Sequence, residues 1–285
     1  MRADCHIHMV LDGVYWKAAI AHQKERVDEA LVRQRLEEYR RCGAEYLRDG
    51  GDRWGAGALA AKLAPEYGIR YRTPCFPIYK TGHYGSFIGR GFSTPAEYRA
   101  LVRAAKAAGA HFIKIMISGL MDFEHYGVLT DEPLAPGEIA DMIAGAHDEG
   151  FSVMAHANGD SAVRAALAAG VDSIEHGAKP NDEILRLFRE RGAFLCTTLS
   201  PALPYALFDR SISHATYEQQ ENGKIVFDGI VALAKANLAA GVPVGLGTDV
   251  GCPYITHYDM WRELHYFVKY CGVTPAFALY SATKL

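Results

Sequence analysis

Residues 106–115, KAAGAHFIKI, contain a joint that recurs along the chain: a helix-like segment, a glycine and a short strand-like run. Glycine is favoured directly after a helix because it adopts a left-handed backbone conformation at little cost. The runs that follow are short and rich in β-forming residues, which is typical of strands. The same joint occurs at six further glycines: Gly43, Gly68, Gly150, Gly170, Gly192 and Gly241.

These seven joints and an opening strand at residues 2–8 predict eight strands that alternate with helices. Apolar residues recur at helical spacing in residues 24–42 and 138–149, and Pro136 fits the start of the second helix. Alternating strands and helices predict a parallel sheet, and eight units in 285 residues predict a closed (β/α)8 barrel. An open, doubly wound sheet is the alternative, although no glycine-rich nucleotide-binding motif follows the early strands.

The composition narrows the class of protein. A hydrophobic content of 49% can fill a large core, and a net charge of −3 argues against nucleic acid as a partner. The six cysteines form no CxxC pair, which indicates free thiols in a reducing cytoplasm. With no predicted leader or membrane span, we expect one cytoplasmic domain over residues 1–285 that acts on a small molecule without a membrane partner. A homo-oligomer is compatible with this composition.

Polar side chains cluster at the predicted strand ends, where the active site of a (β/α)8 barrel lies. His6 and His8 in DCHIH face the same side of their strand, since alternate residues of a strand share a face, and could bind one metal. Each polar residue alone could be structural, but their occurrence on successive strands favours a metal site. The other strand-end candidates are Lys114, His156, His176 and Asp249.

Histidines with a carboxylate suit zinc or a similar divalent ion. Lys114 does not fit this set as a cation, because an ammonium group repels metals and is costly to bury. A carbamate formed with CO2 would convert Lys114 into an anion able to bridge two metals. The sequence permits this modification without requiring it.

Five motifs in this order resemble the amidohydrolase superfamily of metal-dependent hydrolases. More closely, the chain resembles the branch with imidazolonepropionase-like and prolidase-like members, and GAEYLRDGG, YKTGHYGS and FLCTTLSP resemble further segments of that branch. The resemblance extends from Asp4 to the end of the chain. The motifs are DCHIH (4–8), FIKIM (112–116), MAHA (154–157), IEHG (174–177) and GTD (247–249).

The resemblance implies a binuclear centre, with zinc expected. His6, His8 and Asp249 would bind one metal, His156 and His176 the other, and N-carboxylated Lys114 would bridge the two. A bridging hydroxide would attack an amide in a dipeptide-like compound, an N-acyl amino acid or a cyclic amide. Asp249 would act as general base and then general acid, and His83 would stabilise the oxyanion.

Other functions stay open on the sequence alone. A lactonase or phosphotriesterase-like hydrolase would use the same metal ligands. A mononuclear deaminase fits less well, because MAHANGD (154–160) has no glutamate and Lys114 is present. A non-catalytic metal-binding scaffold is the remaining alternative.

The loops after the strands are expected to select the substrate. They supply the substrate-binding candidates His83, Tyr84, Tyr205 and Tyr254, for which solvated rim positions are the alternative. Because the HxH motif begins at residue 6, we expect the accessory β-sandwich of many relatives to be absent or truncated. The C-terminal stretch TPAFALYSATKL (274–285) also ends earlier than is usual in the branch.

Overall fold

The computed structural model describes residues 2–281; Met1 and residues 282–285, the last four of the C-terminal stretch, lie outside the described residues. The strands are β1 (Ala3–Ile7), β2 (Tyr46–Asp49), β3 (Arg70–Arg72), β4 (Pro77–Lys80), β5 (Arg90–Phe92), β6 (Ile113–Met116), β7 (Val153–Asn158), β8 (Ser173–Gly177), β9 (Phe194–Cys196) and β10 (Val244–Gly245).

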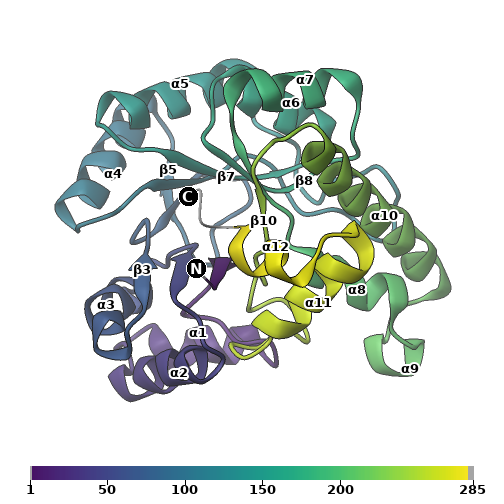
Figure 1. Ribbon diagram of the computed structural model, residues 1–285. Helices are drawn as coiled ribbons and strands as arrows, with labels where there is room; N and C mark the ends of the chain where they lie inside the picture. Colours follow the sequence, from purple (N-terminus) through teal and green to yellow (C-terminus); the bar gives the residue numbers. More distant parts are fainter. Residues whose placement is uncertain (1, 282–285) are drawn as a thin grey trace.

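Helices lie around the outside of these strands (Figure 1). They are α1 (Trp16–Gln23), α2 (Glu29–Arg41), α3 (Ala56–Leu63), the 3-10 helix η1 (Ala64–Tyr67), α4 (Pro95–Ala107), α5 (Pro136–Asp148), α6 (Asp160–Ala168), α7 (Asp182–Arg191), α8 (Leu199–Leu207), α9 (Arg210–Ser213), α10 (Tyr217–Ala239), α11 (Met260–Cys271) and α12 (Pro275–Tyr280).

The paired strands form two parallel sheets, β1-β2-β3 and β10-β9-β8-β7-β6-β4-β5. Backbone hydrogen bonds join the two sheets. Between the edge strand β1 and the residue after β10, the Cys5 N–H donates to the Leu246 carbonyl at 3.0 Å, and between the segments before β6 and after β3, the His111 N–H donates to the Thr73 carbonyl at 2.9 Å. The strand ladders do not close by themselves, but these bonds connect the two sheets, and the predicted (β/α)8 barrel class is confirmed.

The joint glycines behave as predicted. All seven have φ between 66° and 85°, the left-handed region in which a side chain is strained. A strand follows each of them within a few residues. The third predicted strand is split into β3 and β4, because Cys75 between them has a φ of 64° and breaks the extended backbone.

Two helix boundaries show what the local sequence specifies. The helix expected over residues 24–42 begins only at Glu29, because the Asp28 side chain caps it by accepting from the Leu31 N–H at 3.1 Å. The helix expected over 138–149 begins with Pro136 in its first turn, which confirms that start. The short elements β5 and α9, and helix α8 directly after β9, were not predicted.

The strands β1, β2, β6 and β7 are buried along their whole length, as expected for a parallel sheet covered by helices. This burial brings polar strand residues into the barrel, where they need partners. Within residues 2–281, no helix combines the length and apolar character that crossing a bilayer requires.

Candidate metal centre

The six predicted metal ligands line one cavity of about 320 Å³ at the C-terminal ends of the strands. We call them the ligand cluster: His6 and His8 at β1, Lys114 in β6, His156 in β7, His176 in β8 and Asp249 after β10. They come from five separate places in the chain, and the barrel brings all of them together. Their roles as ligands stay predictions.

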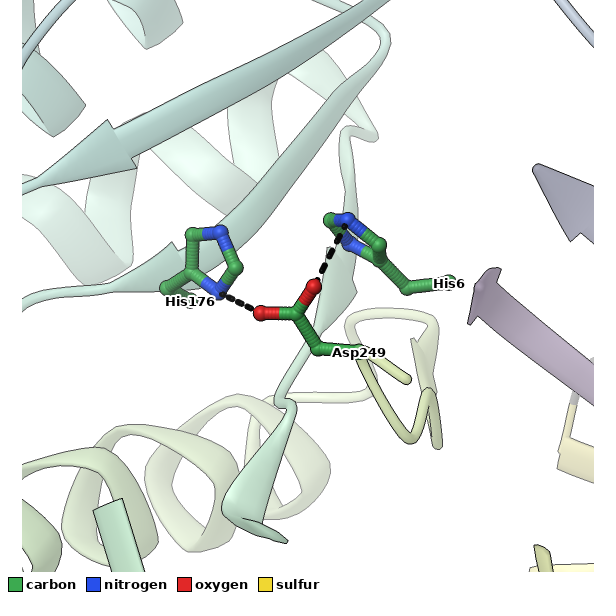
Figure 2. A group of neighbouring side chains, drawn as sticks. All are labelled: His6, His176 and Asp249. Carbon is green, nitrogen blue, oxygen red and sulfur yellow. Dashed lines mark ion pairs between the residues drawn. The ribbon is translucent and has the colours of Figure 1, made fainter. Parts of the chain in front are cut away.

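Asp249 lies at the centre of the cluster. Its Oδ1 is 3.4 Å from His6 Nε2, and its Oδ2 is 3.8 Å from His176 Nδ1 (Figure 2). Its Oδ1 also lies 3.3 Å from His8 Nε2. One donor atom from each of His6, His176 and Asp249 lies within 4.8 Å of the other two, a spacing that one ion can span. Burial alone would raise the pKa of Asp249, but the three histidines hold it well below its usual value. Asp249 is therefore a carboxylate.

Burial favours the neutral form of the histidines. Desolvation, with Lys114 nearby, lowers the pKa of His6 to about 4, and desolvation lowers that of His176 to about 3. The pKa of His156 is also well below its usual value, chiefly because of burial. Neutral imidazole is the form that binds metals, so these three histidines have a ring nitrogen available to bind a cation.

Glu175 orients His6. Its Oε2 lies 2.8 Å from His6 Nδ1, and its Oε1 accepts hydrogen bonds from Arg48 at 2.6 Å and Ser173 at 2.8 Å. Burial by itself raises the pKa of Glu175, but Arg48 and His6 lower it below the usual range. The carboxylate thus favours the proton on Nδ1 and leaves Nε2 directed at Asp249.

Two further contacts position the histidines of β7 and β8. His176 Nδ1 lies 2.7 Å from Thr198 Oγ1, and His156 Nε2 lies 3.1 Å from Asn158 Nδ2. Sequence reasoning gave Glu175, Thr198 and Asn158 no role. A signal was available for two of them. Glu175 is adjacent to the predicted ligand His176, and Asn158 lies two residues after the predicted ligand His156.

Two buried nitrogens in the cluster have no hydrogen-bond partner among the described residues: His8 Nδ1 and Lys114 Nζ. Lys114 is 1% exposed, and burial lowers its pKa to about 8. An unpartnered buried polar group is costly, so Lys114 needs a partner or a modification that the described residues do not supply. Together with the neutral histidines and the carboxylate, this donor set fits divalent metal ions.

Gly50 makes room for His8. A Cβ at Gly50 would lie 2.3 Å from Cε1 of the His8 ring, closer than real contacts allow. The strand-2 segment resembling the family therefore includes a glycine that is needed by a histidine on the neighbouring strand.

Of the four substrate-binding candidates, two line a cavity and two do not. Tyr84 lines the cavity and stacks on His156 with ring centroids 4.9 Å apart. Tyr205 lines an adjoining cavity. His83 and Tyr254 are outside the lining of both cavities within residues 2–281: His83 Nδ1 lies 3.2 Å from Asp131 Oδ2, and the Tyr254 hydroxyl donates to the Ile212 carbonyl at 2.7 Å. The roles of all four stay predictions.

Known proteins resemble this chain in sequence. Ochratoxinase from Aspergillus niger is 28% identical over 194 residues, which cover 66% of this chain and 38% of that protein. The match therefore spans well under half of the relative's length. The model of the Amidohydrolase family matches residues 17–284, so His6 and His8 precede the matched region and their assignment rests on the geometry.

Solved structures share the fold. A Bifidobacterium longum protein assigned as a prolidase is 28% identical with a TM-score of 0.79, and the alignment covers 98% of this chain and 66% of that one. A Xaa-Pro dipeptidase with methionine bound in its active site is 23% identical with a TM-score of 0.76, covering 98% and 72%. The chain belongs to the amidohydrolase family, whose members generally use divalent metal ions.

Proposed function

We propose that this member of the amidohydrolase family is a metal-dependent hydrolase that cleaves amide bonds with two divalent ions held by the ligand cluster. The observation that carries the proposal is Lys114. Its Nζ is buried without a partner in the described residues, and it lines the same cavity as four histidines and a carboxylate. A lone ammonium group is a poor neighbour for cations, whereas a carbamate anion is a suitable ligand for them.

In this proposal His6, His8 and Asp249 would hold one ion, His156 and His176 would hold the other, and carboxylated Lys114 would serve as a ligand to both. Carboxylation of the ammonium group forms one bond between Nζ and the carbon of CO2 and releases two protons, one on forming the free amine and one on forming the carbamate. It replaces a buried cation by an anion and gives Nζ the partner that it lacks. Zinc suits the imidazole and carboxylate donors.

When bound, the two ions would lower the pKa of water and polarise the substrate carbonyl. Asp249, whose pKa lies well below its usual value, would accept the proton of the attacking water and deliver it to the departing amine. Glu175 holds the His6 ring in place through Nδ1. Tyr84, stacked on His156, covers one side of the cavity and limits access of bulk water.

The names of related proteins favour an amide over an ester as the bond that is cleaved. The names Xaa-Pro dipeptidase and bottromycin amidohydrolase denote the hydrolysis of amide bonds, and both proteins share this fold, with TM-scores of 0.76 and 0.65. A lactone or phosphotriester substrate would use the same ligands, so both compounds belong in the first activity panel.

Metal content measured by elemental analysis tests the centre. Wild type, Lys114→Ala and the control Lys106→Ala, whose residue lies exposed on α4, are purified without chelator in bicarbonate buffer. We expect about two ions per chain in wild type and the control, and a marked loss in Lys114→Ala. One ion per chain that the Lys114 substitution leaves unchanged would contradict the bridge. Absence of metal after reconstitution would contradict the whole centre.

A further inference from the structure

The cavity of the ligand cluster continues into a second cavity of about 360 Å³. We call the first the aromatic chamber, because Trp16, Tyr84 and Phe87 contribute to its wall. The second is the loop chamber, walled by Phe123, Tyr205 and apolar residues of α8 and α10. Each volume lies near the lower end of the range for small-molecule sites.

The two chambers meet at the metal centre. Five residues line both of them: Leu120, His176, Asp249, Cys252 and Pro253. A reacting bond beside Asp249 therefore has one chamber on each side of it. A substrate that fills both chambers needs a sizeable group on each side of the scissile bond.

The walls of both chambers include apolar residues and pairs of aromatic rings in contact with each other. Trp16 and Phe87 meet edge to face with centroids 5.8 Å apart in the aromatic chamber. Phe123 and Tyr205 stack at 4.3 Å with an interplanar angle of 12° in the loop chamber. Such surfaces favour aromatic or bulky apolar groups.

The charges that line the chambers disfavour an anionic substrate. Among residues 2–281, Lys114 is the one lysine or arginine that lines either chamber, and the proposed function assigns it to the metals. The loop chamber instead carries the carboxylates of Asp122 and Glu124. A substrate carboxylate would lose its water there without an arginine or lysine partner.

We infer that the substrate is a neutral amide with a bulky apolar or aromatic group on each side of the scissile bond, and without a free carboxylate next to it. The inference rests on the proposed function, which it makes more specific. It excludes simple dipeptides and N-acyl amino acids, because both carry a carboxylate beside the bond that is cleaved.

Three matched compounds test this substrate class. N-(phenylacetyl)phenethylamine has two aromatic arms and no charge, N-(phenylacetyl)-L-phenylalanine adds only a carboxylate, and N-acetylphenethylamine lacks one arm. The kcat/KM of the metal-loaded protein is measured by amine release. Binding is measured separately through tryptophan fluorescence in the Asp249→Asn variant, after elemental analysis has shown that this variant retains its metal. We expect the neutral two-armed amide to exceed each of the others by about tenfold or more.

A charge substitution sharpens the test. Leu120 lines both chambers and is 44% exposed, so the barrel should tolerate a longer side chain there. Leu120→Lys should improve the ratio of acid to neutral amide several-fold, whereas the control Leu120→Met should leave this ratio unchanged.

The outcomes separate the two proposals. If the acid or the one-armed amide binds and reacts as well as the neutral two-armed amide, the substrate class is wrong. The class is also wrong if the two-armed amide neither binds nor reacts. In that case, hydrolysis of a small dipeptide would still support the proposed function. If the two-armed amide binds in the expected order but no amide is hydrolysed, the ligand class is supported and the proposed hydrolase function fails.

Discussion

The ligand cluster and the walls of the two chambers are built differently. Five of the six cluster residues are at most 7% exposed, and His6, His156 and His176 have polar neighbours that orient their rings. The chamber walls come largely from loops and helices and include Leu120, which is 44% exposed. Under the proposed function, polar networks in the barrel would determine where the metals bind, and apolar loop contacts would determine what binds beside them. Substitutions in the two regions should therefore affect different measurements.

The largest effect is expected at Asp249. Asp249→Asn removes the base while retaining the shape of the side chain, so kcat/KM should fall by roughly 10²–10⁴-fold. Asp228→Asn, at an exposed position of α10, is the matched control and should behave as wild type. Steady-state kinetics would measure this, with circular dichroism as a check of folding and elemental analysis as a check that the variant keeps its metal. Activity within tenfold of wild type would exclude Asp249 as the proton-transfer group.

A smaller loss is expected when the partner of a ligand changes. Glu175→Gln leaves Arg48 without its buried counter-charge and weakens the orientation of His6, so metal affinity should fall about 10–100-fold. Competition with a fluorescent chelator measures this affinity. The control is Glu190→Gln, which removes an exposed carboxylate on α7. Unchanged affinity in the Glu175 variant would show that His6 needs no such partner.

Gly50→Ala tests the contact between β1 and the loop after β2. The new Cβ would collide with the His8 ring, at a cost of roughly 1–3 kcal/mol in the free energy of unfolding, and metal content should fall with it. Gly137→Ala is the control, because a Cβ in α5 at that position meets no atom within 4 Å. Urea unfolding and elemental analysis distinguish the two variants. Equal stability and metal content would show that the ring has room to move.

The smallest effect is expected in the chamber walls. Tyr205→Ala removes the ring that stacks on Phe123, a contact of about 0.5–1.5 kcal/mol, so KM for an aromatic amide should rise several-fold. Metal content should stay at the wild-type level, because Tyr205 lies outside the ligand cluster. A loss of metal in this variant would contradict the proposed separation of cluster and walls.

Local patterns were sufficient to predict the barrel and to select the strand-end residues that line its cavity. The joint glycines need a left-handed backbone wherever they lie, and HxH places both imidazoles on one face of a strand whatever surrounds it. The split of the third strand was missed because no local pattern indicates it. It depends on the positive φ of Cys75, and cysteine has no preference for that conformation. The loop helices α8 and α9 were missed because the prediction treated that segment only as a loop after the seventh strand.

The sequence by itself determined the order of the strands and the residues at their ends, because these follow from spacings of two to four residues. Only the tertiary structure decided which distant groups serve them. Glu175 meets His6 across 169 residues of chain, and Gly50 clears space for His8 from a neighbouring strand end. The division of the substrate site into two chambers likewise depends on loops that meet only after the barrel forms. Such contacts produce no regular spacing of residues in the sequence, because they arise from packing in three dimensions.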